Sequence, residues 1–189
     1  MKKFSGTLLF LKASIKDFRN TGSFLPSSKY LAIKLAAPIS FRPKMKVVEL
    51  GAGNGSITKY LLNVLPSDAR LFSVELNKSL ANRLDSSIKD SRFTLIRGDA
   101  SKLSEHLKEY NIGRVDYIIS GLPLGNFPVK LRKSVYEEII KCLDSNGIYT
   151  QFQYFMASLM EIRKHFKVKD ISFEWRNIPP AFIYTCKLK

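Results

Sequence analysis

From Lys46 onward, short runs rich in β-branched residues alternate with segments of helical periodicity. The predicted strands cover residues 44–50, 70–76, 92–98, 114–120, 147–153, 168–175 and 181–188. The predicted helices cover residues 54–65, 79–88, 101–110, 128–147 and 157–165. This alternation favours a parallel sheet with helices on both faces, to which the closing hairpin adds one antiparallel strand. We therefore expect an α/β fold with a doubly wound, seven-stranded, mostly parallel sheet and an antiparallel last strand.

The first 45 residues predict a basic helical arm that precedes a domain at residues 46–189. Residues 1–46 contain ten Lys or Arg and one acid, so they carry +9 of the formal net charge of +15. Apolar residues of the arm, among them Phe4 and Leu8, recur at helical spacing beside cations such as Lys12. Such a helix can lie in a membrane interface and favour anionic lipids. The alternative is a helix that packs on the sheet or caps the site.

The composition indicates a polyanionic partner and a reducing compartment. A net charge of +15 suits an anionic phospholipid surface or nucleic acid. The two cysteines, Cys142 and Cys186, provide no disulfide framework and fit a cytoplasmic protein. The apolar run at residues 8–11 is too short for a transmembrane helix or a secretory signal. No Cys or His pair has metal-ligand spacing, so we expect no metal.

The segment "VVELGAGNGSIT", residues 47–58, is a strand that ends in an acid, followed by alternate glycines and a helix. Glycines at 51, 53 and 55 allow a tight turn and bring backbone N–H groups close to the anionic end of a ligand. A nicotinamide fingerprint would require glycine at position 56, where Ser56 stands. Glu75 ends the second strand, where a carboxylate can accept hydrogen bonds from both hydroxyls of a ribose. The alternative is a glycine-rich turn without a ligand.

The pattern Glu49-x-Gly51-x-Gly53-x-Gly55 resembles motif I of the Rossmann-like class I S-adenosylmethionine-dependent methyltransferases. The resemblance implies that the loop approaches the methionine part of S-adenosylmethionine. It also implies that Asp99 contacts the adenine amino group and that Leu76 and Ala100 pack on the ring faces. The implied reaction is in-line transfer of a methyl group, in which the protein mainly orients the acceptor and excludes water.

The acceptor is indicated by "SGLPLGNFP", residues 120–128, which follows the fourth strand. Methyltransferases that act on amino groups have Asn or Asp, then Pro, then an aromatic residue here, whereas this chain has Ser120, Pro123 and Leu124. Loss of a stacking ring removes roughly 1–3 kcal/mol of contact with a nucleobase, unless Phe127, which lies close by in sequence, replaces that ring. We expect Ser120, Leu122 and Pro123 to form the catalytic acceptor position, unless this is only a Pro-containing loop.

Four segments, "FLPSSKYLA", "ELGAGNGSIT", "SGLPLGNFP" and "WRNIPPAFIY", together resemble the bacterial phospholipid N-methyltransferases over nearly the whole chain. The resemblance implies stepwise methylation of phosphatidylethanolamine towards phosphatidylcholine by a cytoplasmic enzyme that associates peripherally with the inner membrane. Ala52 and Asn54 stand where that family more often has Pro and Thr, a departure that concerns cofactor affinity more than the acceptor. A tyrosine, Tyr30, Tyr154 or Tyr184, is expected to assist removal of the amine proton.

The connection between the last two strands lies at the same sheet edge as the glycine loop, because the sixth strand points that way. Trp175 is an aromatic residue of the kind that favours membrane interfaces, and Arg176 can pair with a lipid phosphate. The alternative is a surface Arg that braces the hairpin.

Two other functions remain open. The phospholipid enzymes are related to the ribosomal RNA adenine dimethyltransferases, which append a helical RNA-binding domain after the catalytic core. Here the chain stops at Lys189, directly after the last predicted strand, which makes nucleic acid the less favoured partner. The third reading is a non-catalytic lipid- or RNA-binding module that keeps the fold.

Overall fold

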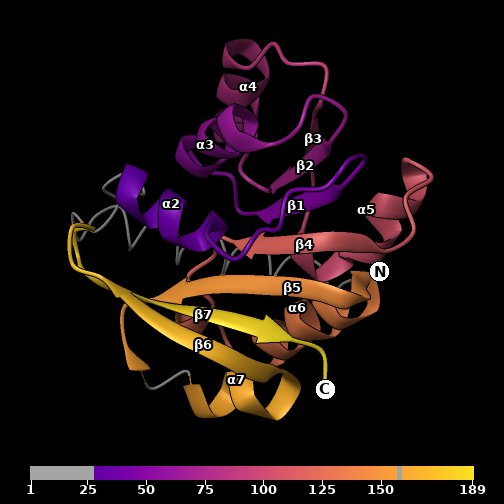
Figure 1. Ribbon diagram of the computed structural model, residues 1–189. Helices are drawn as coiled ribbons and strands as arrows, with labels where there is room; N and C mark the ends of the chain where they lie inside the picture. Colours follow the sequence, from indigo (N-terminus) through magenta and orange to yellow (C-terminus); the bar gives the residue numbers. More distant parts are fainter. Residues whose placement is uncertain (1–27, 157–158) are drawn as a thin grey trace.

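The computed structural model describes residues 28–156 and 159–189 (Figure 1). Its strands are β1 (Lys46–Leu50), β2 (Arg70–Glu75), β3 (Phe93–Arg97), β4 (Val115–Ser120), β5 (Leu143–Gln153), β6 (Lys167–Glu174) and β7 (Ala181–Lys187). Its helices are α2 (Lys29–Ala36), α3 (Ser56–Val64), α4 (Lys78–Ser87), η1 (Ala100–Lys102), α5 (Leu103–Glu109), η2 (Leu124–Asn126), α6 (Val129–Cys142) and α7 (Leu159–His165). No helix in these two ranges combines the length and hydropathy needed to span a membrane.

The seven strands form one sheet in the order β3-β2-β1-β4-β5-β7-β6, which confirms the predicted doubly wound architecture. β7 is antiparallel to both of its neighbours, and the other pairings are parallel. β6 therefore runs in the same direction as β5. The carboxyl ends of β1 to β6 consequently meet at one edge of the sheet, here called the carboxyl edge. Strand order reverses between β1 and β4, the position where such sheets bind ligands.

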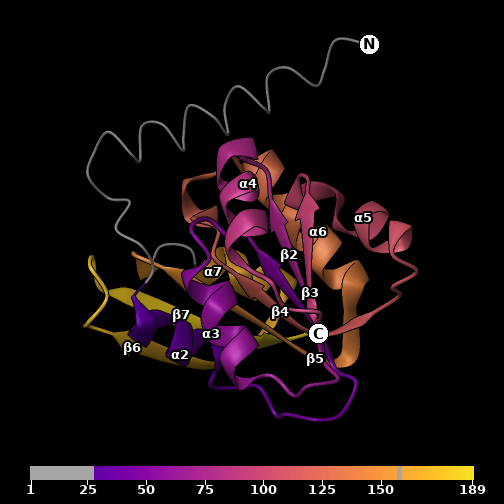
Figure 2. The same cartoon turned by 90° about the horizontal axis from the view of Figure 1, so that it is seen from above.

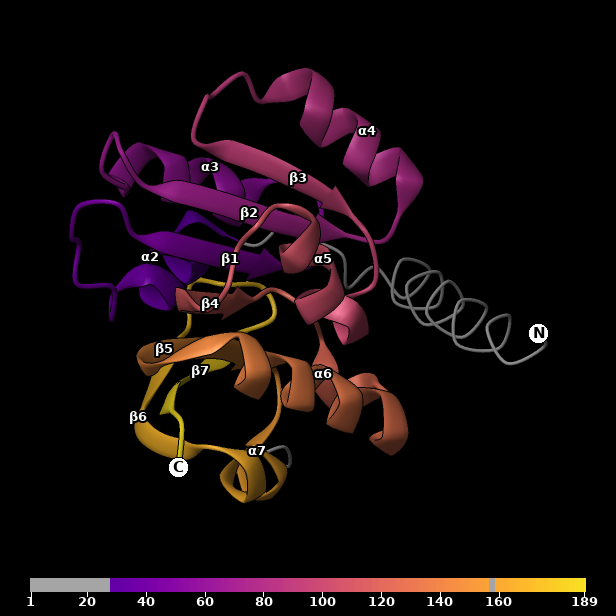
Figure 3. The same cartoon turned by 90° about the vertical axis from the view of Figure 1, so that its right-hand side faces the viewer.

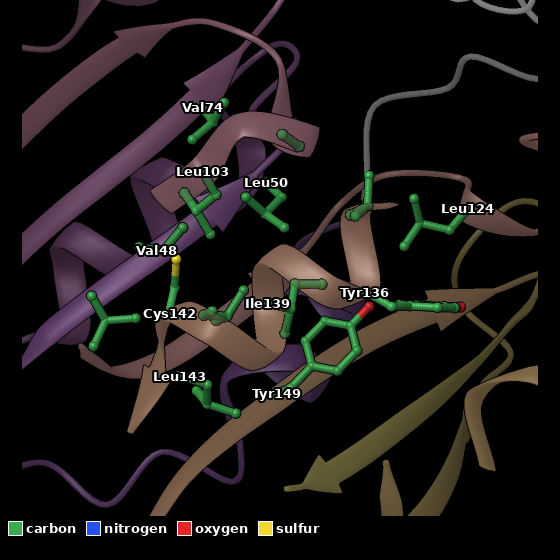
Figure 4. Packing of buried hydrophobic residues seen from close by; sticks show 14 of the residues in the cluster. Val48, Leu50, Val74, Leu103, Leu124, Tyr136, Ile139, Cys142, Leu143 and Tyr149 are labelled. Atoms are coloured by element: carbon green, nitrogen blue, oxygen red, sulfur yellow. The ribbon is translucent and has the colours of Figure 1, made fainter. Parts of the chain in front are cut away.

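The two faces of the sheet are covered by different helices, so each face has its own apolar core. One core joins α5, α6 and α7 to residues such as Leu50, Val74 and Tyr149 (Figure 4). The other joins α2, α3 and α4 to residues that include Val47 and Leu71. Figure 3 shows α2 and α6 on opposite sides of the sheet. Burial on both faces explains why the central strands are almost continuously apolar.

Helix α2 belongs to the second core, although its residues lie within the predicted arm. Ser28 caps the helix by accepting a hydrogen bond from the Leu31 N–H, and the Leu35 carbonyl accepts one from the Thr150 hydroxyl. The Ser28 N–H donates to Asn177 Oδ1 at 3.1 Å, which ties the start of α2 to the β6–β7 connection (Figure 2). Residues 1–27, with Phe4, Leu8 and Lys12, lie outside the described residues.

The predicted helix at residues 128–147 is wrong at its C-terminal end. Helix α6 stops at Cys142, and β5 begins at Leu143, which pairs with Val115 of β4. Leu143 has extended backbone angles, φ −75° and ψ 136°. Its apolar side chain suits the helical pattern and the strand equally well, so pairing with β4 decides its conformation. The predicted helix at residues 157–165 is α7 from Leu159, and residues 157–158 lie outside the description.

Candidate active site

The glycine loop crosses the carboxyl ends of β1 and β2 in a conformation that other residues rarely adopt. Gly51, Gly53 and Gly55 have φ angles of 76°, 58° and 82°. The Gly51 N–H donates to the Val74 carbonyl at 2.9 Å, and Gly55 begins α3 in the left-handed region. A Cβ added to Gly53 would meet nothing closer than 4.0 Å. The loop therefore forms a bare backbone surface that suits a ligand able to contact peptide groups closely.

Glu75 holds this loop from the end of β2. Its Oε2 accepts a hydrogen bond from the Gly53 N–H at 2.8 Å, and its Oε1 accepts one from the Asn77 N–H at 2.7 Å. Each carboxylate oxygen can accept a second hydrogen bond. The predicted ribose-binding acid thus lies directly against the glycine loop and retains acceptor capacity for hydroxyl groups.

Glu49, the acid at the end of β1, is completely buried behind the loop. Its Oε2 accepts hydrogen bonds from the hydroxyls of Thr58 and Ser73, both at 2.6 Å. Its Oε1 has no hydrogen-bond partner among the described residues. Burial raises the pKa of Glu49 to about 7, against the opposing effect of the two hydroxyls. Glu49 is therefore only partly ionised at neutral pH, which sequence alone did not indicate.

Asp99 and Ala100 follow β3 beside the end of β2, where the Gly98 N–H donates to the Glu75 carbonyl at 3.2 Å. The Asp99 carboxylate accepts a hydrogen bond from the Ser101 N–H and so begins η1. Ala100 and Leu76 both contact the first apolar core. The structure thus brings these three expected cofactor residues, with Glu75, to two adjacent strand ends.

The acceptor loop, residues 120–128, packs directly on the glycine loop. A Cβ on Gly51 would lie 2.5 Å from the Leu122 side chain, and a Cβ on Gly121 would lie 2.9 Å from the Gly51 carbonyl. Ser120 is buried, and its hydroxyl accepts a hydrogen bond from the Leu122 N–H. Contact between the two loops places Leu122 and Pro123 next to the candidate cofactor position.

Phe127 does not serve as a stacking ring in this structure. Its side chain is buried in the first core with Leu124 and Leu131. The suggestion that Phe127 replaces the missing aromatic residue is therefore wrong for this conformation. The reason is tertiary: η2 turns the loop so that Leu124 and Phe127 both face the apolar core.

Arg176 has protein partners on two sides. Its guanidinium donates two hydrogen bonds to the buried Glu174 carboxylate, Nε to Oε1 at 2.8 Å and Nη2 to Oε2 at 3.0 Å. It also stacks on the Tyr30 ring, 3.9 Å from the ring centroid. Trp175 is highly exposed beside it. Tyr30 therefore meets Arg176 at the carboxyl edge, whereas the alternative Tyr184 is completely buried in the sheet.

Sequence reasoning missed two buried glutamines of β5 that lie near the acceptor loop. Gln153 Oε1 accepts a hydrogen bond from the Gly125 N–H at 3.2 Å, so Gln153 holds the acceptor loop to β5. Gln151 pairs with Ser120 in register, and Nε2 of both glutamines lacks a partner among the described residues. The available signal in the sequence was a pair of glutamines at alternate positions near the end of the predicted strand at residues 147–153.

The described ranges contain neither a cluster of metal ligands nor an activated cysteine. No group of three His, Cys, Asp or Glu side chains there could hold a metal ion. Cys142 and Cys186 are buried, and burial raises the pKa of each thiol to about 12. Both cysteines are consequently poor nucleophiles at neutral pH.

A doubly wound sheet with a glycine loop after its first strand and an acid at the end of the next strand is typical of Rossmann-like domains that bind a nucleotide cofactor. The family model described as "Methyltransferase domain" matches residues 47–147. The chain belongs to this family of S-adenosylmethionine-dependent methyltransferases, and S-adenosylmethionine is its cofactor. The open cradle above Gly53 and the acceptor capacity of Glu75 fit that cofactor.

Two relatives cover different shares of the chain. The chain is 30% identical over 189 residues to an ornithine lipid N-methyltransferase of Singulisphaera acidiphila, covering 99% of this chain and 97% of the relative. It is 29% identical over 131 residues to ribosomal RNA small subunit methyltransferase A of Thermosynechococcus vestitus, covering 67% of this chain but only 48% of that protein. The first relative is named for a lipid substrate, and the second for RNA.

Solved structures share the fold at lower identity. A TehB-like S-adenosylmethionine-dependent methyltransferase from Corynebacterium glutamicum has a TM-score of 0.61 at 16% identity, covering 94% of this chain and 97% of that one. TrmN from Thermus thermophilus has a TM-score of 0.66 at 17% identity, and the chain covers 48% of its length. These similarities support the fold assignment only.

Proposed function

We propose that this enzyme transfers a methyl group from S-adenosylmethionine to the amine of a membrane-lipid head group. The observation that carries the proposal is the full-length similarity to a lipid N-methyltransferase, which extends beyond the cofactor domain at both ends. The acceptor loop supports it, since Leu124 replaces the usual aromatic residue and Phe127 is buried. A nucleobase would find no ring of this loop to stack on.

Each cofactor residue has a proposed role that follows from its position. When bound, S-adenosylmethionine supplies an electrophilic methyl group. The backbone of Gly51, Gly53 and Gly55 holds the methionine portion, with Glu49 buried behind it. Glu75 accepts hydrogen bonds from the ribose hydroxyls, Asp99 accepts one from the adenine amino group, and Leu76 and Ala100 contact the ring.

The acceptor side consists of Ser120, Leu122 and Pro123, with Tyr30 at the carboxyl edge. An ammonium must lose a proton before it can attack, and a cationic, apolar environment lowers the pKa of an amine. Segments 28–30, 120–128 and 174–176 contain one carboxylate side chain, that of Glu174. Arg176 neutralises its charge. We infer that these segments favour the neutral amine and leave the proton to water, and we propose that Tyr30 relays it.

Two head groups satisfy this chemistry. Phosphatidylethanolamine is favoured by the four sequence motifs, and ornithine lipid is favoured by the full-length relative. Each combines an amine with an anionic group, a phosphate or a carboxylate. A basic enzyme that associates peripherally with an anionic membrane suits both.

The test is transfer of a labelled methyl group to three acceptors in parallel: vesicles with phosphatidylethanolamine, vesicles with ornithine lipid, and ribosomal RNA. Label in the lipid extract from either vesicle, absent with an Asp99→Ala variant, is the expected result. Label in RNA alone would overturn the proposal in favour of an RNA adenine methyltransferase. Cofactor binding without transfer to any acceptor would indicate a non-catalytic module.

A further inference from the structure

The most exposed large apolar side chains lie on one side of the molecule. Among the described residues, five have the largest exposed fractions, and we call them the apolar rim: Val129 (64%), Phe155 (74%), Met160 (69%), Trp175 (70%) and Ile178 (68%). All five follow the carboxyl ends of β4, β5 or β6. Exposed apolar groups that gather in one place indicate a contact surface, whereas scattered ones do not.

The apolar rim lies in or directly after three connections, and one of these, the β4–α6 connection, is the acceptor loop. Figures 1 and 2 show the β5–α7 and β6–β7 connections together at the left-hand end of the sheet. The hydrogen bond from the Gly125 N–H to Gln153 joins the β4–α6 connection to the end of β5. A partner that covers the apolar rim therefore also faces the place where the methyl acceptor enters.

The charge around the apolar rim selects the kind of partner. Lys29, Lys130 and Arg176 are exposed near it. Residues 121–130, 154–160 and 174–180 contain a single acid, Glu174, which is buried against Arg176. Apolar side chains that include Trp, Met and Phe, beside cations and without exposed acid, match the interface of an anionic bilayer.

We propose that the apolar rim inserts into the interface of an anionic lipid bilayer and places the acceptor loop at the head groups. The proposal rests on the lipid substrate proposed above. A lipid amine would then reach Leu122 and Pro123 while its acyl chains stay in the membrane. The apolar rim includes none of residues 1–27, whose predicted amphipathic face lies outside the described residues.

The chain carries its own reporter, because Trp175 is its only tryptophan. The full-length wild-type protein is mixed with vesicles of phosphatidylglycerol and phosphatidylcholine that contain brominated acyl chains. We expect a blue shift of the emission and quenching by bromine. Absence of quenching at saturating vesicle concentration would overturn the proposal. Emission that is already blue-shifted and protected from iodide in solution would also overturn it, because residues 1–27 would then cover the apolar rim.

Substitutions separate the apolar rim from the arm. The variant Phe155→Ser/Met160→Ser/Ile178→Ser is expected to lower the vesicle partition coefficient by about tenfold or more, since three exposed apolar groups no longer leave water. Phe41→Ser is the matched control, because Phe41 is exposed in the α2–β1 connection, on the opposite edge. Equal partitioning of the triple variant and the control would reject the proposal. Cofactor affinity verifies folding, and Phe155→Ser alone should show a smaller loss in the same direction.

Failure of this inference is distinguishable from failure of the proposed function. If a lipid is methylated but bromine does not quench Trp175, the apolar rim is rejected and the lipid substrate stands. If bromine quenches Trp175 but neither lipid accepts a methyl group, the membrane surface stands and the proposed substrate is rejected.

Discussion

Glu75 of β2 and Gly53 of the glycine loop are joined by a hydrogen bond of 2.8 Å from the Gly53 N–H to the carboxylate. The same side chain also accepts a hydrogen bond from the N–H of Asn77, the residue that caps the start of α4. One acid therefore holds the loop, the end of β2 and the start of the next helix together. Its proposed contact with ribose depends on this pre-organised position.

Replacing Glu75 with Ala should lower the affinity for S-adenosylmethionine at least about tenfold. Hydrogen bonds to a charged group contribute about 1.5–3 kcal/mol each, and the variant loses both the anchoring of the loop and the ribose contacts. Isothermal titration calorimetry measures the change. Glu105→Ala is the control, since Glu105 is an exposed acid of α5. Unchanged affinity in Glu75→Ala would remove Glu75 from the cofactor site.

Glu49 should make stability depend on pH near neutrality. Its pKa in the folded protein is about 7, above the ordinary 4.5, so the folded state retains a proton that the unfolded state releases. Its contribution to stability is full below pH 4.5 and is lost as the pH rises to about 7. Glu49→Gln, measured without cofactor, should melt at a higher temperature than wild type at pH 8 and show little difference at pH 4. The effect is on the order of 3 kcal/mol. A difference that does not vary with pH would contradict this origin.

Gly121→Ala should weaken both loops. Its new Cβ would lie 2.9 Å from the Gly51 carbonyl oxygen, and backbone atoms cannot turn aside as a flexible side chain can. We expect a loss of about 1–3 kcal/mol in the free energy of unfolding, with a parallel loss of cofactor affinity. Gly113→Ala is the matched control, because a Cβ there meets no atom within 4 Å. Equal melting temperatures of the two variants would show that the loops separate readily.

Arg176→Ala should destabilise the protein more at pH 7 than at pH 3. Hydrogen bonds from Arg176 lower the pKa of Glu174 to about 2, against the opposing effect of its burial. The stability from this pair is therefore present above about pH 4.5 and is lost as the pH falls towards 2. Without Arg176, an unpaired carboxylate stays buried at neutral pH. The double variant Arg176→Ala/Glu174→Gln should recover most of the lost stability, as measured by thermal unfolding. If it does not, the unpaired Glu174 carboxylate is excluded as the cause of the loss.

The same double variant tests the proposed contact between Arg176 and a lipid phosphate, because it removes the guanidinium without a buried unpaired charge. Turnover of phosphatidylethanolamine should fall several-fold while cofactor affinity is kept. Ornithine lipid, whose head group has a carboxylate instead of a phosphate, is the parallel substrate. Equal losses of lipid turnover and cofactor affinity would reject a direct phosphate contact.

Periodicity in the sequence was sufficient for the seven strands and their approximate bounds, because the alternation of short β-branched runs with helical patterns can be recognised within a few residues of the chain. It failed at the junction of α6 and β5, where Leu143 suits either structure until β4 supplies a pairing partner. For the site, the glycine spacing and the acid at position 75 could be recognised from sequence. Both are local requirements: left-handed backbone at three glycines and a carboxylate at a strand end.

Tertiary structure alone decided what surrounds those residues. The burial of Glu49, the inward orientation of Phe127 and the link between Gln153 and Gly125 all depend on which strands become neighbours. The apolar rim likewise exists only because β4, β5 and β6 end at the same edge. The sequence determined the helices and strands and the chemistry of the residues at their ends, since both depend on only a few neighbouring residues. The order of the strands determined the environment of each side chain, since burial and pairing join residues far apart in the chain.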